Sequence, residues 1–538
     1  MEQYDYIIVG AGSAGCVLAN RLTESGRNRV LLLEAGPSDR RFWVQVPIGY
    51  GKTFYDGRVN WMYRTEPMPG LGGRINYYPR GKVLGGSSSI NAMVYSRGQA
   101  GDFDDWEAMG NPGWGWKDVL PIYKRMEDHE LGAGPFHGAG GPLHVTEISR
   151  AVHPLSHVFV KAGREAGLAL NPDLNGSTIE GVGLYQLTTR NGFRMSAARA
   201  YLWPVRKRAN LRIATDALAT RILFEGKRAV GIAYRRRGQT VLARAGREVI
   251  LSGGSINSPQ LLQLSGVGPA DVLRSCGVEI HHESPAVGGN LQDHLCYDYL
   301  YRSKVPSLND DLYPWRGKLR AGLQYILTRK GPLALSVNQG GGFFRSRPDL
   351  TRPNIQLYFS PLTHEWTPPG TRPLMSPDPF PAFTTSVSPC RPSSRGHLQI
   401  KSSDPSDAPV IHPNYLSTNH DVEELLAGAR FLRRLAQTPS MASVIGEELK
   451  PGPAAQSDAE LIADIRERCY SVFHPVSTCR MGLNPAEAVV DHRLKVHGLS
   501  GLRVIDASIF PTVTSGNTNA PAIMVGEKGA DLVLQDSR

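Results

Sequence analysis

The feature that most constrains the fold is a glycine-rich turn near the amino terminus. Gly10, Gly12 and Gly15 have the spacing G-x-G-x-x-G, and they separate a strand-like run at residues 4–9 from a helix-like stretch at residues 16–23. In such a turn the first glycine permits a tight bend, the second lets the backbone approach a pyrophosphate, and the third lets helix and strand pack closely. The turn therefore predicts a βαβ unit that binds a dinucleotide.

A carboxylate follows at the place where the ribose of a dinucleotide is expected. Residues 29–34 again read as a strand, and Glu34 ends it about twenty residues beyond the start of the motif. An acid at this position accepts hydrogen bonds from ribose hydroxyls and disfavours a 2′-phosphate. Ser13 and Ala14 complete the predicted phosphate cradle at the positive end of the helix. The motif alone leaves NAD and FAD both open.

Periodicity farther along the chain predicts that the nucleotide-binding unit is discontinuous. Residues 211–244 read as a meander of strands, and residues 248–254 read as a buried strand that enters a helix at 258–264. Residues 301–391 have fewer βαβ signals and more proline and aromatic residues, which indicates a second lobe. Residues 498–538 return to a strand–turn–helix pattern. We therefore expect a first domain from residues 1–155, 195–300 and 498–538, and a second from residues 156–194 and 301–497.

Charge and cysteine usage exclude several other classes of protein. The net charge is +11, but the excess is spread over short clusters such as residues 206–208 and 235–237, so we predict no nucleic-acid partner. The six cysteines fit neither a zinc site nor a disulfide framework, and we predict no metal. No apolar run is long enough to span a bilayer. We expect a cytoplasmic protein whose basic surface permits membrane association.

Several longer motifs are specific to one family when they occur together in this order. They are GKVLGGSSSINAMVYSRG at 81–98, GSINSPQLLQLSGVG at 254–268, VGGNLQDH at 287–294, HPVSTCRMG at 474–482 and DASIFPTVTSGNTNAPAIMVGEK at 506–528. With them the chain resembles the glucose–methanol–choline (GMC) oxidoreductases essentially from end to end, in particular the branch similar to choline dehydrogenase. The resemblance implies an α/β (α+β overall) fold, with a Rossmann-type FAD-binding domain and a substrate-binding domain built on an antiparallel sheet.

The resemblance also implies FAD as the cofactor and indicates which residues hold it. By resemblance the flavin and pyrophosphate lie beside Gly85, Gly86, Asn91, Ala92, Met93 and Val94, the adenine beside Ala219, and the ribityl–phosphate stretch beside Asp506 and Ala507. Asn519 is expected to be the N-cap of the last helix, with Pro521 in its first turn. Some members of the family tether the flavin through a histidine just before the asparagine. Here that position is Ile90, so we expect non-covalent FAD.

The chemistry implied is oxidation of a primary or secondary alcohol to the carbonyl, with hydride transfer to flavin N5. A base must take the hydroxyl proton, and histidine suits that task near neutral pH. By resemblance His474 is the base and Asn517 its partner, which holds the substrate oxygen. Ser477 stands where many relatives have glycine, which we expect to shift the His474 loop slightly. His294 is expected to have a structural role.

Several questions stay open at the level of sequence. A lyase or decarboxylase on the same fold, or a non-catalytic flavin-binding protein, is an alternative to the alcohol oxidoreductase. The electron acceptor is a quinone or dye, or else oxygen. The particular alcohol, the residues of its pocket and the oligomeric state do not follow from the sequence.

Overall fold

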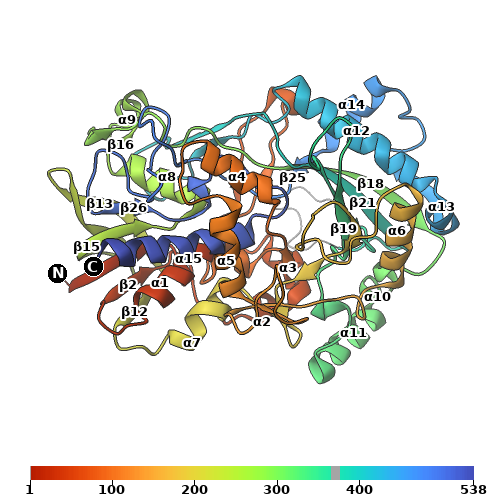
Figure 1. The fold of residues 1–538 in the computed structure, drawn as a ribbon, viewed down its shortest axis with the longest axis horizontal. Helices are drawn as coiled ribbons and strands as arrows, with labels where there is room; N and C mark the ends of the chain where they lie inside the picture. The colour runs from red at the N-terminus through yellow and green to blue at the C-terminus, as the bar shows by residue number, and fades with distance from the viewer. Residues whose placement is uncertain (1, 365–375, 538) are drawn as a thin grey trace.

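The computed structural model describes residues 2–364 and 376–537 and shows two lobes, each built on a seven-stranded sheet (Figure 1). The first lobe, at the left of the figure, holds both termini of the chain, and the second lobe is formed mainly by the later half of the sequence. Strand β26 (Leu502–Val504), near the end of the chain, pairs with β15 (Gln239–Leu251) in the sheet of this first lobe.

The first sheet has the order β12-β2-β1-β15-β14-β13, with β26 also pairing β15. Five strands pair in parallel, namely β12, β2, β1, the end of β15 and β26, whereas β13 and β14 form an antiparallel meander with the beginning of β15. Tyr6, Ile7 and Ile8 of β1 are fully buried, as expected for a parallel strand covered on both faces. The strands are β1 Glu2–Val9, β2 Val30–Leu33, β12 Leu211–Ala214, β13 Ala217–Glu225, β14 Arg228–Arg236, β15 Gln239–Leu251 and β26 Leu502–Val504.

The second sheet is antiparallel throughout, with the order β24-β18-β21-β20-β19-β8 and β25 pairing β18. This agrees with the predicted antiparallel second lobe. Its strands are β8 Gly181–Leu184, β18 Leu295–Ser303, β19 Gly340–Phe344, β20 Ile355–Ser360, β21 Ala382–Pro389, β24 Ile445–Lys450 and β25 Tyr470–Ser471.

Helices cover the outer faces of both sheets. In the first lobe α1 and α15 pack side by side along the sheet, and in the second α6 and α12 cover the sheet on the side away from the first lobe (Figure 1). The longer helices are α1 Ser13–Leu22, α4 Ala100–Ala108, α5 Trp116–Met126, α6 Pro154–Glu165, α8 Gly254–Leu264, α11 Trp315–Thr328, α12 Asn419–Ala436, α14 Asp458–Arg468 and α15 Asn519–Asp536.

Strand β18 shows why the second sheet has one apolar face and one polar face. Successive side chains of a strand point to opposite faces. Tyr297, Tyr299 and Tyr301 lie in the hydrophobic core shared with α12, whereas Cys296 and Asp298 line a cavity on the opposite face. The second sheet therefore contributes a wall to a site that faces the first lobe.

Two helix starts differ from the sequence prediction. Helix α8 begins at Gly254 and not at residue 258. Helix α15 begins at Asn519, so its N-cap is Thr518, and the prediction of Asn519 as N-cap is wrong by one residue. Thr518 already has near-helical backbone angles (φ −90°, ψ 0°), and its side chain makes no capping hydrogen bond, so sequence preferences for caps do not mark this boundary.

The division into two domains remains a prediction, and two observations bear on its boundaries. Strand β18 of the second sheet starts at Leu295, within the range assigned to the first domain. Val476, Val489 and Val496, assigned to the second domain, lie in the hydrophobic core of the first lobe.

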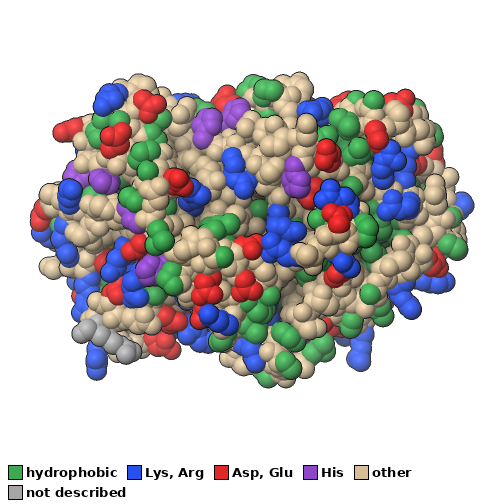
Figure 2. All heavy atoms as spheres, turned by 45° about the horizontal axis from the view of Figure 1, so that its top comes forward, with side chains coloured by type: hydrophobic (Ala, Val, Ile, Leu, Met, Phe, Trp, Pro, Cys, Tyr) green, Lys and Arg blue, Asp and Glu red, His purple; other side chains and the backbone are tan. Residues whose placement is uncertain are grey.

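Positive and negative side chains are mixed over the surface of the molecule. Figure 2 shows Lys and Arg side chains interspersed with Asp and Glu over the face that it draws, without one continuous basic field. Across residues 2–364 and 376–537, no helix combines the length and apolar character needed to cross a bilayer.

Candidate active site

A cavity of about 400 Å³ collects most of the predicted site residues, and both lobes contribute to its walls. It extends from the glycine turn after β1 to the segment around His474. The predicted residues that line it are Gly10, Gly12, Ser13, Ala14, Glu34, Gly86, Asn91, Ala92, Met93, Val94, Ala219, His474, Asp506, Ala507, Asn517 and Asn519. Segments far apart in the sequence thus meet at one elongated site.

Three predicted residues, Gly15, Gly85 and Pro521, do not line the cavity. A Cβ on Gly15 would lie 1.9 Å from the carbonyl oxygen of Gly10, so Gly15 serves close packing of α1 on β1. Gly85 has φ +89° and donates its N–H to Ala11. Pro521 is buried within the first turn of α15. These residues shape the walls and do not face the cavity.

The glycine turn fits a group that approaches the backbone closely. Gly10 has φ +102°, and a Cβ there would lie 2.4 Å from the carbonyl oxygen of Ser252. On Gly12, in contrast, the nearest atom to an added Cβ is 3.8 Å away, and this residue faces the cavity. A side chain at Gly12 would fill space that the fold otherwise leaves open. Helix α1 begins here without a side-chain cap, so its first N–H groups remain available to phosphate oxygens.

Glu34 lies at the end of β2, where a ribose is expected. Its two carboxylate oxygens accept hydrogen bonds from the backbone N–H groups of Ala11 (3.1 Å) and Gly36 (2.9 Å). Burial raises the pKa of Glu34 to about 7, although these two hydrogen bonds oppose the shift. Each oxygen keeps a further lone pair, so the carboxylate can also accept from ribose hydroxyls.

A buried arginine that the sequence did not indicate holds the loop beside the predicted flavin position. Arg194 donates to the backbone oxygen of Asn91 (2.6 Å) and to its side-chain oxygen (2.7 Å), and also to the carbonyls of Val44 and Ser88. Met93, two residues after Asn91, has φ +63°. These contacts fix a strained loop against the cavity, which suits a rigid planar ligand.

Three helices, α1, α8 and α15, begin at the wall of the cavity. Ser13 of α1 donates to the side-chain oxygen of Asn519 in α15 (2.8 Å). The carboxylate of Asp506 accepts from the N–H of Gly254 (2.8 Å) and the hydroxyl of Ser258 (2.6 Å), which fixes the start of α8. The first turns of these helices have backbone N–H groups without a partner inside the helix. Such donors fit the pyrophosphate and the ring edge of FAD.

His474 belongs to a chain of three side chains. Its Nδ1 lies 3.0 Å from Nδ1 of His294, and its Nε2 lies 3.1 Å from the amide nitrogen of Asn517. The Nε2 of His294 lies 2.9 Å from the carbonyl oxygen of Cys390. Sequence reasoning paired His474 with Asn517, and the structure brings the two together.

The hydrogen-bond chain determines the tautomer of His474. The carbonyl of Cys390 can only accept, so Nε2 of His294 carries a proton. A neutral His294 then accepts at Nδ1 from the Nδ1–H of His474, which leaves Nε2 of His474 with its lone pair. Burial lowers the pKa of His474 well below its usual value, and the neighbouring His294 and Arg80 lower it further. His474 is therefore a neutral imidazole whose unprotonated Nε2 accepts a hydrogen bond from the side-chain amide of Asn517 at the cavity.

A buried carboxylate positions the backbone of both histidines. Asp293 accepts at Oδ1 from the N–H groups of His294 (2.9 Å) and His474 (2.7 Å). Its Oδ2 accepts from the hydroxyl groups of Tyr78 (2.7 Å), Tyr415 and Ser471. Five donors converge on one carboxylate that is 3% exposed, so the segment carrying His474 has little freedom to move.

The loop after His474 adopts a backbone conformation that favours glycine. Ser477 has φ +77°. Its hydroxyl oxygen accepts a hydrogen bond from the side-chain amide of Gln292 (3.2 Å). The expected shift of the loop is not large enough to separate His474 from Asn517.

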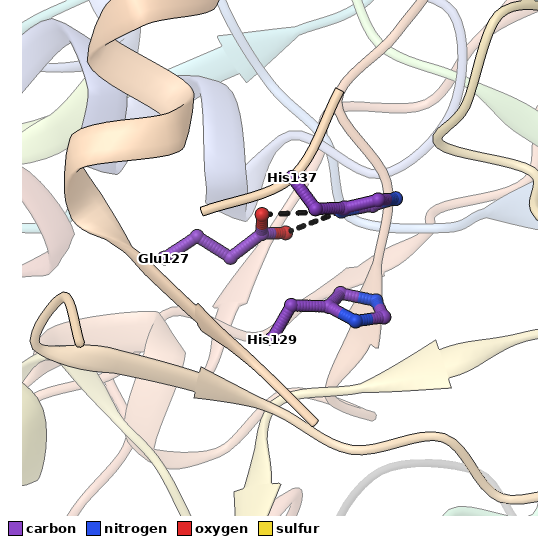
Figure 3. Close-up of side chains that lie close together, drawn as sticks. All are labelled: Glu127, His129 and His137. Carbon is purple, nitrogen blue, oxygen red and sulfur yellow. Dashed lines mark hydrogen bonds and ion pairs between the residues drawn. The ribbon is translucent and has the colours of Figure 1, made fainter. Parts of the chain in front are cut away.

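A second cluster of possible metal ligands lies away from this cavity. Glu127, His129 and His137 come together in Figure 3, with His137 hydrogen-bonded to the carboxylate of Glu127. Arg97 also contacts that carboxylate at 2.6 Å. Burial lowers the pKa of His137, but hydrogen bonds to Asp173 and Glu127 outweigh it and raise the pKa to about 9. Glu127 is thus held in an ion-pair network with Arg97 and His137.

The chain is similar to known proteins over almost its whole length. The family models of the GMC oxidoreductases match residues 4–296 and 392–526. The chain is 45% identical to the mitochondrial choline dehydrogenase of Mus musculus, over 99% of this chain and 89% of the relative. It is 44% identical to an alcohol dehydrogenase [acceptor] of Pseudomonas putida, over 99% of this chain and 96% of the relative.

Solved structures show the same fold. Pyridoxine 4-oxidase from Mesorbium loti superposes with a TM-score of 0.87 at 33% sequence identity, and the match covers 98% of each chain. The α/β fold, the FAD cofactor and the activity class expected from the sequence are thereby confirmed. The chain belongs to the GMC oxidoreductases and is an FAD-dependent enzyme that acts on CH–OH groups.

Proposed function

We propose that His474 is the base that removes the hydroxyl proton of the alcohol, and that Asn517 holds the alcohol oxygen. The observation that carries the proposal is the chain from Cys390 through His294, which leaves Nε2 of His474 unprotonated. A hydroxyl that donates to this nitrogen is placed to accept from the amide of Asn517, which lies 3.1 Å from it. The amide then stabilises the negative charge that develops on the oxygen.

FAD is proposed to bind non-covalently in the cavity. Glu34 and the glycine turn would hold its adenosine and phosphate groups, and the loop around Asn91 would hold its ring system. Ile90 offers no nucleophile for a covalent bond to the flavin. When bound, FAD supplies the acceptor for the hydride that leaves the alcohol carbon. The residues of the chain provide the base and orient the alcohol. Because the side chain of His474 is only 8% exposed, they also shield it from water.

The wall of the cavity near His474 supports a proposal for the substrate class. Asp298 lines this wall and accepts from the hydroxyl of Tyr470 (2.8 Å), and the ring of Tyr358 lines the same cavity. A carboxylate beside aromatic rings attracts organic cations. We propose an alcohol with a cationic group, in agreement with the relative named choline dehydrogenase.

Asp298→Asn tests this substrate class with a neutral isostere as internal control. For the variant, kcat/KM for choline is expected to fall by about tenfold or more, which corresponds to about 1.4 kcal/mol. For 3,3-dimethylbutan-1-ol, which has the same shape without the charge, the expected change is less than about threefold. An equal loss for both alcohols would contradict the assignment of Asp298.

The acceptor and the compartment are further parts of the proposal. A quinone or dye acceptor agrees with the relative named alcohol dehydrogenase [acceptor]. A cytoplasmic location agrees with six free cysteines, five of them buried. Enzyme bleached by alcohol without oxygen is expected to reoxidise faster with a quinone than with air-saturated buffer. A lyase or a non-catalytic protein would not be bleached at all, and faster reoxidation by oxygen would make the enzyme an oxidase.

A further inference from the structure

Helix α11 presents an apolar face to solvent. Its five large apolar side chains Trp315, Leu319, Leu323, Ile326 and Leu327 are between 51% and 79% exposed. The helix stands at the lower edge of the second lobe in Figure 1, clear of both sheets. Soluble monomers rarely leave contiguous apolar surface of this kind exposed, so we expect this face of the helix to bind a partner.

The spacing of these residues makes them one stripe. They occupy positions i, i+4, i+8, i+11 and i+12, which share one side of a helix with about 3.6 residues per turn. Ala321 and Tyr325 lie on the opposite side and are buried. Tyr325 packs with Val46 and Ala334 and fastens the helix to the molecule. The stripe is therefore the outer face of a helix that is anchored by its inner face.

Cations accompany the stripe. Arg316, Lys318 and Arg320 lie within α11, Arg329 and Lys330 follow it directly, and the helix contains no acidic residue. Arg320 pairs with Asp311. For the other four cations, the residues that the structure describes supply no ion-pair partner. An apolar stripe with basic neighbours is typical of helices that lie in the interface of an anionic membrane.

The neighbouring segment extends this surface toward the cavity. Val46, four residues before α3 (Tyr50–Thr53), shares a hydrophobic cluster with Tyr325 of α11, so this segment packs against the inner face of the helix. Phe42 and Trp43 of the preceding short helix α2 (Phe42–Gln45) are 54% and 36% exposed. Tyr50 at the start of α3 lines the cavity. The exposed surface and the wall of the cavity thus share one short stretch of chain.

We propose that α11 docks the enzyme on a membrane that contains anionic lipids. The apolar stripe enters the boundary between headgroups and acyl chains, and Arg316, Lys318 and Lys330 contact lipid phosphates. A second copy of the chain suits this surface less well, because a symmetric contact would bring two sets of these cations together. The proposal does not depend on which alcohol the enzyme oxidises.

Vesicle flotation tests the proposal with the FAD-loaded full-length protein. We expect binding to vesicles of phosphatidylglycerol and phosphatidylcholine, at least about tenfold weaker binding to pure phosphatidylcholine, and weakening with salt. Leu319→Gln with Leu327→Gln, and separately Arg316→Gln with Lys318→Gln, are expected to weaken binding by about tenfold or more. Leu483→Gln, a change at a 67% exposed leucine elsewhere, is the matched control and is expected to bind as wild type.

Activity with a soluble dye separates docking from catalysis. Both double variants are expected to retain wild-type flavin content and dye-coupled rates, because α11 contributes no residue to the lining of the cavity. Wild-type protein that does not float with anionic vesicles would overturn the proposal, as would double variants that float like wild type. A dimer of the wild type that the Leu319→Gln/Leu327→Gln variant converts to monomer would assign the face to self-association instead.

Discussion

Replacing His294 by phenylalanine is expected to slow alcohol oxidation although His294 does not line the cavity. The ring of phenylalanine keeps most of the shape of a side chain that is 1% exposed, but it removes the acceptor for Nδ1–H of His474. A buried donor without a partner costs about 1–3 kcal/mol. The tautomer that keeps Nε2 unprotonated loses this amount of stabilisation. At about 1.4 kcal/mol per factor of ten, the rate of flavin reduction falls by about 5- to 150-fold.

His294→Asn distinguishes the lost acceptor from a general disturbance of the core. The side-chain oxygen of asparagine takes the place of Nδ1 of the histidine, so this variant is expected to recover most of the rate. His397→Phe, at an exposed histidine of β22 (His397–Gln399), is the control and is expected to react as wild type. All four proteins should hold FAD equally, because no contact of His294 reaches the glycine turn.

The assay is the rate of flavin bleaching after anaerobic mixing with alcohol, measured across pH. Burial is the main cause of the low pKa of His474, and His294 contributes to it. Without His294 the pKa of the base rises, so the acidic limb of the pH–rate profile moves to higher pH in His294→Phe. A wild-type rate and profile for His294→Phe would refute the tautomer argument. An asparagine variant as slow as the phenylalanine variant would refute it equally.

Two further outcomes follow from burial and backbone strain. Because burial raises the pKa of Glu34 to about 7, the apo-protein is expected to bind FAD up to about tenfold more tightly at pH 8 than at pH 6. The Glu34→Gln variant is expected to lose this pH dependence. Fluorescence titrations in which wild-type FAD affinity does not change with pH would contradict the prediction. Without FAD the same group lowers the free energy of unfolding as pH rises from about 4.5 to about 7, since its folded pKa exceeds its unfolded pKa of 4.5. At Ser477, with φ +77°, valine is expected to be less stable than glycine by about 1–2 kcal/mol in urea unfolding, and equal stabilities would contradict the strain.

The sequence predicted the parts of the site that depend on local structure. The glycine turn and Glu34 follow from a strand, a turn and a helix that are contiguous in the chain, so their pattern is visible without the fold. His474 and Asn517 were found through the family resemblance, because neither residue is distinctive by itself. The error at Asn519 arose because Thr518 is already close to helical and makes no cap.

The remaining site residues depend on contacts between distant segments. Asp293 meets Tyr78 and Ser471 across 215 and 178 residues of sequence, so no local pattern shows its five donors. Arg194 meets Asn91 across 103 residues. One signal was available for Asp298, because tyrosines at every second position from 297 to 301 indicate a strand with a separate opposite face. Which sheet that face would line could not be predicted before the strand pairing was known.

The most direct test of the account is the rate of flavin reduction in His474→Ala. Anaerobic alcohol is expected to bleach the wild-type enzyme, and the variant is expected to retain its yellow FAD but to bleach about 10²–10⁴-fold more slowly. A variant with normal FAD content that is reduced at the wild-type rate would show that Nε2 of His474 is not the base, and the central claim would be wrong.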